Sequence, residues 1–296
     1  PFNLQMNSIQ SVLLNFGTEE QRERWIPKLI NADLLGCFAI TEPNTGSDVA
    51  SMKSTAVEAE GGFVLNGTKM WISGVPVADL GIVFVYTDKA AKHRGMSAFI
   101  VDMHLPGVTQ KSIDSKLGLF CAPTGEIIFE DVKVPKDCMV GQKGDGFKIC
   151  MAMLDNTRLS SASRAVGVAR ACLEHSVRYA NEREQFGQPI ANFQMIQEQI
   201  AEMYVEEQAA RLLVYRAACN KDLGQRNTIE VSCAKYYAAE VAVKAANTAV
   251  KIFGSYGFST EYPVERFYRD AKSYQIVEGT SNIQKMIIAR NTLGLK

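Results

Sequence analysis

From residue 146 onward the sequence is built of long stretches with helical periodicity, and these constrain the fold more than any other feature. Each of four stretches reads as one long helix: 147–182, 190–222, 227–254 and 279–292. Pro189, Gly224 and the glycines at 254 and 257 separate them. Long helices joined by short connections pack as antiparallel bundles. The sequence therefore predicts a C-terminal four-helix bundle over 146–296.

The preceding region, 36–145, has a different sequence pattern, in which short apolar runs are separated by turn residues. The runs lie at 36–40, 62–67, 80–86, 97–101 and 126–132. Asn66-Gly67 is a typical hairpin turn. This pattern predicts a middle β domain, antiparallel in its pairing, so the chain as a whole is an α+β multidomain protein.

Residues 1–35 have helical character. One segment stops at Gly17, and the next opens with Thr18 as its N-cap. The apolar positions of this second segment are expected to face inward: Trp25, Ile26, Leu29 and Ile30.

Charge, cysteines and histidines exclude several classes of function. Thirty-two basic side chains balance thirty-two acidic ones, whereas a nucleic-acid partner requires a concentrated basic face. The longest apolar stretch, 80–87, is too short for a transmembrane segment. No two of the seven cysteines lie closer than 12 residues and the three histidines lack metal spacing, so we expect no metal site. Phosphate-binding glycine motifs and a nucleophile elbow are also absent.

Three strings carry residues suited to binding or chemistry. The first, 38–48, runs from a strand into a loop with hydroxyls, a glycine and backbone N–H groups. Such a loop can hold a heteroaromatic edge or a pyrophosphate, and it can equally be a polar turn. In the second string, Trp71 and Ser73 share one face of a strand. In one interpretation, Trp71 stacks against a flat ligand and Ser73 forms a hydrogen bond with it. In the other, the tryptophan belongs to the core and the serine lies at the surface.

The third string places Glu278 among Ile276, Val277 and Ile283 near the start of the last helix. Apolar surroundings would raise the pKa of its carboxyl group toward the range of a general base. The alternative is a negative charge that faces the helix dipole.

Together these strings resemble the acyl-CoA dehydrogenase family, in the family's order and across a helix–β–helix layout. Further matching strings lie at 155–158, 182–187, 193–194, 266–271 and 284–290. The resemblance extends over essentially the whole chain and is most similar to the glutaryl-CoA and alicyclic acyl-CoA dehydrogenase branch. It implies three parts: the remnant of an N-terminal helical domain at 1–35, whose remainder we expect upstream, the middle β domain at 36–145, and the bundle at 146–296.

The resemblance also implies FAD, held between the β domain and the bundle of a homotetramer. Seven positions of the β part match cofactor-binding residues: Phe38, Ile40, Thr41, Gly46, Ser47, Trp71 and Ser73. Seven more lie in the helical part: Arg183, Phe186, Gln194, Lys251, Ser255, Thr280 and Asn282. Of these, Arg183, Phe186 and the positions at 251–255 match residues that reach a neighbouring subunit's FAD. Five positions match substrate-binding residues: Ser47, Asp155, Arg158, Gly279 and Arg290.

The implied activity is the dehydrogenation of an acyl-CoA thioester to the trans-2-enoyl-CoA. In the family a carboxylate removes the α-proton while the β-hydride passes to flavin N5, and an electron-transfer flavoprotein receives the electrons. Glu278 matches that base, and Thr157, at the base position of a minority of relatives, cannot serve. The alternatives are an acyl-CoA oxidase that uses oxygen and a non-catalytic relative with a binding or scaffold role.

Two departures from the family pattern bear on detail. Val277 stands where many straight-chain members have tyrosine, which leaves room for a cyclic or branched acyl group. Lys251 replaces a glutamine at the subunit-crossing FAD contact. The expected location is the bacterial cytoplasm or the mitochondrial matrix, where scattered cysteines stay reduced.

Overall fold

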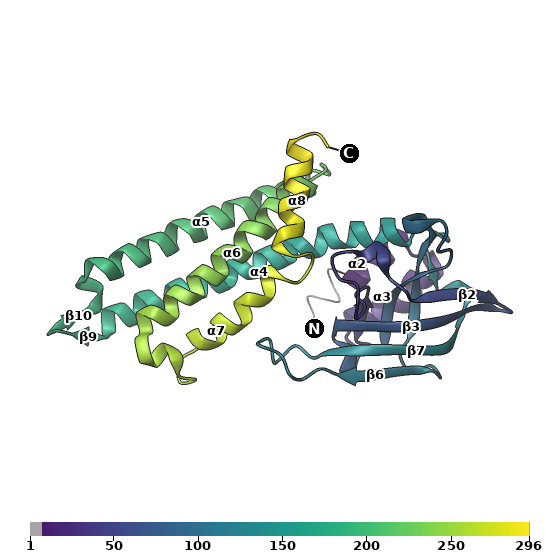
Figure 1. Cartoon of the computed structure of the whole chain (residues 1–296), viewed down its shortest axis with the longest axis horizontal. Coiled ribbons are helices and arrows are strands. Elements are labelled where there is room, and N and C mark those ends of the chain that lie inside the picture. Colours follow the sequence, from purple (N-terminus) through teal and green to yellow (C-terminus); the bar gives the residue numbers. More distant parts are fainter. Residues whose placement is uncertain (1–7, 296) are drawn as a thin grey trace. The chain divides into compact units, whose positions relative to one another are not determined.

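The computed structural model describes residues 8–295, which fall into two compact units (Figure 1). The first unit comprises 1–116 and 120–157, and the second comprises 117–119 and 158–296. The long helix α4 (Gly146–Glu182) contributes to both, because the boundary falls between residues 157 and 158. The expected division of the chain at residues 35 and 145 stays a prediction.

The first unit opens with two helices, α2 (Gln10–Phe16) and α3 (Glu19–Ile30). Thr18 caps α3 as predicted, because its side chain accepts from the Gln21 amide while the Gln21 side chain accepts from the Thr18 amide. Leu29 is buried, but Ile30 is 64% exposed in this unit, so the expectation that Ile30 faces inward is wrong. The buried side of α3 ends one position earlier than the apolar run suggests.

The sheet of the first unit has eight strands, of which seven follow the order β6-β7-β3-β2-β4-β5-β8. The strand bounds are β1 (Gly36–Ala39), β2 (Thr55–Ala59), β3 (Gly62–Ser73), β4 (Leu80–Tyr86), β5 (Met96–Asp102), β6 (Val108–Ser112), β7 (Thr124–Pro135) and β8 (Met139–Val140). Most neighbours pair antiparallel, as expected from the sequence. The exceptions are β1, which pairs with β4 in parallel, and a single parallel pair between β2 and β4.

Strand β4 is buried along its whole length because both faces of the sheet are covered there. Ile82 and Phe84 pack into a core shared with α2, α3 and the start of α4. Val83 and Val85 pack on the other face, in a core with side chains of β3, β5 and β7. A continuous apolar run is the pattern that two-sided burial requires.

Asn66-Gly67 does not form the predicted hairpin turn, because β3 continues through it. Opposite β7, the pairing register shifts between Leu65 and Gly67, which marks a β-bulge. The Asn66 side chain exchanges two hydrogen bonds with Asp131 across this irregularity, at 3.0 and 2.9 Å. Gly67 has φ 141°, a backbone angle that favours glycine. The Asn-Gly dipeptide therefore forms a β-bulge within the strand and not a turn between two strands.

The second unit is helical and contains the later part of α4 with α5 (Gln194–Asp222), α6 (Thr228–Phe253), α7 (Val264–Ala271) and α8 (Ser281–Thr292). A short hairpin of β9 (Glu184–Gln185) and β10 (Gln188–Pro189) joins α4 to α5 at one end of the unit (Figure 1). Alanines of α6 fill much of the core, so helices α4, α5 and α7 pack closely around it. The four predicted long helices are confirmed, with bounds within a few residues.

Within residues 8–295, no helix is both long enough and apolar enough to cross a lipid bilayer. None of the seven cysteines forms a disulfide bond.

Candidate functional site

In the first unit, the loop that follows β1 is held by a buried ion pair. Glu42 is 6% exposed and accepts a hydrogen bond from Lys69 Nζ at 2.9 Å, and the Lys69 side chain is fully buried. The second oxygen of Glu42 accepts from the Lys53 amide, and Lys69 also donates to the Ile40 carbonyl oxygen. The polar loop at 41–48 therefore rests on a fixed internal support, which its sequence did not reveal.

The ionisation of this pair follows from burial and contact. Burial alone would raise the pKa of Glu42, but the Lys69 charge and hydrogen bonds from Ser54, Lys53 and Lys69 outweigh it and lower that pKa. Burial lowers the pKa of Lys69, although the Glu42 charge and hydrogen bond oppose this. Removal of either charge would leave the other buried without its partner.

Trp71 and Ser73 lie beside this loop and are both exposed in the first unit. The Met70 amide donates to the Thr41 carbonyl oxygen at 2.9 Å, which joins the loop to the end of β3. Trp71 is 54% exposed and has φ 61°, where the register of β3 against β7 shifts again. The bulge turns the Trp71 side chain out of the core, so the alternative of a core tryptophan does not hold within this unit.

The other predicted residues of the first unit divide by exposure. Ile40 is buried, whereas Phe38, Thr41 and Asp155 are half-buried. Gly46 and Ser47 are exposed at the tip of the loop, and a Cβ placed on Gly46 would meet open space. Thr41 lies beside the end of β3 that carries Trp71 and Ser73, whereas Asp155 lies on α4.

In the second unit, Glu278 and Gly279 form a tight turn before α8. Their φ angles are 58° and 85°, so both residues adopt the left-handed region, which is unusual for a glutamate. Arg158 Nε donates to the Glu278 carbonyl oxygen at 3.2 Å, and Lys235 Nζ donates to the Gly279 carbonyl oxygen at 2.6 Å. Gln284 Nε2 donates to both carbonyl oxygens, at 3.3 and 3.0 Å. The backbone of this turn is thus held by donors from three helices.

The segments on either side of the turn are also anchored. Glu240 accepts hydrogen bonds from Gln275 before the turn and from Ser281 after it, both at 2.7 Å. Thr280 is the N-cap of α8, and its side chain accepts from the Ile283 amide. The base predicted at position 278 therefore sits in a rigid backbone frame, while its own side chain is half-buried.

The expected apolar surroundings of Glu278 are not provided by its sequence neighbours. Ile276 is 59% exposed and Val277 is 39% exposed in the second unit. The buried groups close to Glu278 are instead cationic, Lys235 and Arg158. The family resemblance assigned Arg158 as a substrate-binding residue. Its observed contact is to the backbone of Glu278, and a contact with CoA stays a prediction.

A second group of predicted residues lies at the β9–β10 end of the helical unit. The Arg183 guanidinium stands over the Tyr256 ring, 5.6 Å from its centroid, which brings the segment next to Ser255 into contact with the hairpin. Phe186 is 93% exposed with φ 53°, and its ring meets that of Phe193 edge-on at 6.0 Å. An aromatic ring displayed this openly on a strained backbone is suited to contact with another molecule.

The two groups of the helical unit lie far apart. Arg158 and Arg183 are 25 positions apart along α4 and its end, about 37 Å at 1.5 Å per residue. Each of the other exposed predicted residues belongs to one of these two groups. Gln194, Lys251 and Ser255 lie on the side of the hairpin, and Asn282 and Arg290 lie on α8.

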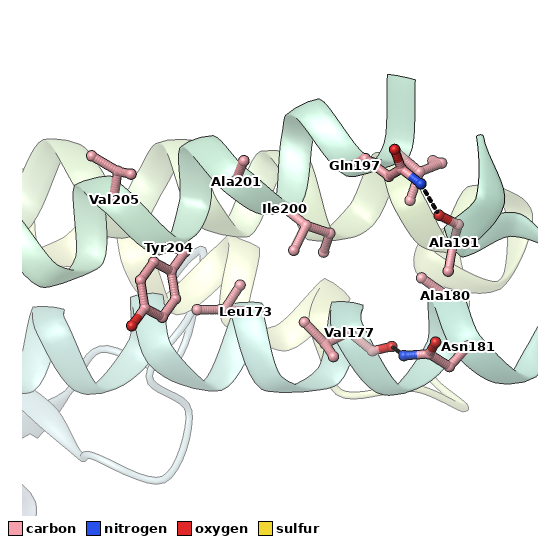
Figure 2. A pocket seen from close by; sticks show the side chains of 11 residues that line it. Leu173, Val177, Ala180, Asn181, Ala191, Gln197, Ile200, Ala201, Tyr204 and Val205 are labelled. Atoms are coloured by element: carbon pink, nitrogen blue, oxygen red, sulfur yellow. Dashed lines mark hydrogen bonds between the residues drawn. The ribbon is translucent and has the colours of Figure 1, made fainter. Parts of the chain in front are cut away.

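An apolar groove of about 460 Å³ runs between α4 and α5 (Figure 2). Leu173 and Val177 line it from α4, and Ile200 and Tyr204 line it from α5. It contains none of the predicted site residues, and no aspartate, glutamate, lysine, arginine or histidine lines it.

Lys235, Gln284 and Glu240 were not identified from the sequence. A lysine within a helix usually extends to the solvent, and only its place between Ala234 and Ala238 in a strongly apolar segment pointed to burial. Gln284 carried no such signal, since its role depends on a turn five residues earlier and on two other helices.

Comparisons with known proteins agree with this architecture. Residues 37–132 match the family model for the acyl-CoA dehydrogenase middle domain, and residues 144–293 match that for the acyl-CoA dehydrogenase C-terminal domain. A glutaryl-CoA dehydrogenase from Desulfococcus multivorans is 49% identical over 99% of this chain and 76% of its own length.

Solved structures show the same likeness. A glutaryl-coenzyme A dehydrogenase in complex with glutaryl-CoA superimposes with a TM-score of 0.97 at 49% identity, covering 99% of this chain and 75% of the other. A structure described as an electron transferring flavoprotein of Acidaminococcus fermentans gives a TM-score of 0.96 at 38% identity, over 98% and 77% of the two chains.

Proposed function

Because the chain belongs to the acyl-CoA dehydrogenase family of FAD-dependent oxidoreductases, we propose that it converts an acyl-CoA thioester to the 2-enoyl-CoA with Glu278 as the base for the α-proton. The observation that carries the proposal is the Glu278–Gly279 turn, whose backbone is held by Arg158, Lys235 and Gln284. A carboxylate on such a frame has the fixed position that proton abstraction requires.

The residues of the first unit fit the FAD of this family. Trp71 presents an exposed ring that can stack on a flat heteroaromatic system, and Ser73 and Thr41 add hydroxyl groups beside it. The open space around Gly46 lets a ligand approach the loop backbone. Once bound, FAD supplies the acceptor for the β-hydride.

Glu278 itself has one task, the removal of a weakly acidic proton. The thioester α-carbon gives up a proton only where the developing negative charge on the thioester oxygen is stabilised. We propose that the backbone N–H of Glu278 donates to that oxygen while its carboxylate accepts the proton. Both groups belong to one residue, so the held turn would fix them together.

The residues of the β9–β10 end support an oligomeric site. Arg183 and Phe186 lie about 37 Å along α4 from the level of Arg158, so we propose that they contact the FAD of a second subunit. We further propose that the protein assembles as a homotetramer and that an electron-transfer flavoprotein is its acceptor, as the family resemblance implies. None of the seven cysteines is in a disulfide, which suits the reducing interior of a bacterial cell or a mitochondrial matrix.

The acyl group is proposed to be cyclic or branched, because Val277 leaves more room than a tyrosine beside the base, or dicarboxylic, because of the likeness to glutaryl-CoA dehydrogenase. Turnover measured across straight, branched, dicarboxylic and cyclic CoA thioesters identifies it. A preference for straight chains would remove this assignment.

The test of the reaction is Glu278→Gln in the FAD-loaded protein. We expect flavin absorbance to be retained and turnover with an artificial electron acceptor to fall by about three orders of magnitude, the contribution of a positioned base. Turnover near that of the parent protein would refute the role of Glu278. Rapid reoxidation of the reduced, product-bound protein by air would instead identify an oxidase.

A further inference from the structure

Lys235 is a fully buried lysine in the middle of α6, and its ammonium group is directed at the turn that carries Glu278. Its Nζ donates to the Gly279 carbonyl oxygen at 2.6 Å, and its side chain has no exposed surface. An ammonium group buried in this way is costly unless hydrogen bonds and opposite charge compensate for it. Here the compensation comes from the segment next to the proposed base.

The charged groups that act on Lys235 are Glu278, Arg158 and Glu240. Arg158 reaches the same turn from α4, and Glu240 holds Ser281 from one and a half turns further along α6. The two cations are buried and the two carboxylates are half-buried, and all four groups lie around this turn. Glu278 is the one of these groups whose ionisation the proposed reaction depends on.

The backbone conformation of the turn needs such support. A glutamate at φ 58° is strained relative to an ordinary helix or strand position. Strain of this kind persists only where the surroundings hold it. Lys235 and Gln284 bind the two carbonyl groups that follow the Glu278 Cα, so they hold the backbone on the C-terminal side of this residue.

Resting on the proposed function of Glu278, we propose that Lys235 is a positioning residue for this base. It fixes the Gly279 peptide through its hydrogen bond, and its positive charge keeps the Glu278 carboxylate ionised and ready to accept a proton. Gln284 contributes to the same geometry without charge.

The ammonium charge is itself sensitive to pH. Burial lowers the pKa of Lys235 to about 8, with the negative charges of Glu278 and Glu240 opposing this and the positive charge of Arg158 adding to it. Above about pH 8 the charge beside Glu278 is therefore lost. The proposed positioning then predicts a decrease in kcat on the alkaline side.

The test compares variants of the FAD-loaded protein by their kinetics. For Lys235→Met we expect kcat to fall about 100-fold with KM within about threefold, as a displaced catalytic group does. The acid limb of its pH profile moves up by about one pH unit, because a neighbouring positive charge favours the ionised carboxylate. For Gln284→Leu we expect kcat to fall about tenfold with the acid limb unmoved, since only geometry is lost.

Ser232→Ala is the matched control. Ser232 is also fully buried on α6, and its hydroxyl has no hydrogen-bond partner among the described residues. Its kcat and its pH profile should match those of the parent protein. Thermal unfolding of all variants establishes that they are folded.

Lys235→Arg gives an independent result if Lys235→Met does not fold. Arginine keeps its charge throughout the accessible pH range, so the alkaline decrease in kcat must disappear in this variant. An unchanged alkaline limb in Lys235→Arg, or parental kcat and acid limb in Lys235→Met, overturns the inference. Glu278→Gln, measured alongside, separates the two possible failures. If the Lys235 variants give a refuting result while Glu278→Gln is inactive, only the role of Lys235 is refuted. If Glu278→Gln is fully active, the proposed function itself is refuted.

Discussion

Replacement of Glu42 by glutamine tests how the polar loop of the first unit is supported. The substitution keeps the shape of the side chain and removes its charge. Lys69, whose side chain has no exposed surface, then loses the carboxylate 2.9 Å from its ammonium group. The Lys53 and Ser54 amides donate hydrogen bonds to the two oxygens of Glu42. In the glutamine variant an NH₂ group replaces one of these oxygens, so two hydrogen-bond donors would face each other.

The expected loss of stability follows from burial. Removal of one partner of a buried ion pair costs about 3–5 kcal/mol, because the remaining charge stays desolvated. For a unit of about 150 residues, 1 kcal/mol shifts Tm by about 2–4 °C, so Glu42→Gln should lower Tm by about 6–20 °C. An exposed ion pair would contribute less than about 1 kcal/mol.

The pH dependence of this loss has a definite sign. The pKa of Glu42 in the folded protein lies below its ordinary value of 4.5, since Lys69 and the amide donors outweigh the effect of burial. The carboxylate therefore contributes its stability above pH 4.5, and the contribution disappears as the pH falls through the lowered pKa. The difference in Tm between the parent protein and Glu42→Gln should shrink over that range.

Calorimetric unfolding of Glu42→Gln, Lys69→Met and the double variant measures the coupling. We expect each single variant to be less stable than the double variant, because the double variant leaves no unpaired charge. FAD retention should fall in Glu42→Gln, since the loop at 41–48 loses its support. A loss below about 1 kcal/mol in both single variants would contradict this account of the loop.

Three further outcomes are expected. Gly67→Ala should lower the free energy of unfolding in urea by more than about 2 kcal/mol, because the new Cβ would clash with the side chain of Ser54. Gly61→Ala is the control: it has open space around it, so its free energy of unfolding should fall by only about 1 kcal/mol. Cys172, whose pKa burial raises to about 12, should resist iodoacetamide in the native protein while the exposed Cys121 reacts. Arg183→Ala should weaken both FAD retention and the tetramer, measured by flavin absorbance and sedimentation; tight FAD binding by a monomeric Arg183→Ala would contradict the intersubunit role.

Much of the fold could be predicted because local signals and long-range packing agree in it. The Thr18 cap is a local feature, and it formed as expected. The long helices were visible because their apolar periodicity extends over many turns. Asn66-Gly67 was misread because a dipeptide that favours positive φ does not specify whether the chain reverses or bulges, and that choice is made by the partner strand β7.

The candidate site was predictable only where residue identity carries the chemistry. Glu278, Trp71 and the loop at 41–48 stood out through their matches to a family pattern. Lys235 and Gln284 did not, since their role arises from the fold, which brings α6 and α8 to carbonyl groups of one turn. Backbone carbonyls leave no mark in a sequence, so the donors that bind them are found only in the structure.

Whether Glu278 removes the α-proton is tested most sharply by a distance. A crystal of the FAD-loaded Glu278→Gln variant, in which bound acyl-CoA should persist, shows where the α-carbon lies. If Glu278 is the base, the side chain at position 278 approaches that carbon to within about 3.5 Å, the separation of reacting groups. A substrate whose α-carbon lies against a different carboxylate, with position 278 out of reach, would contradict it.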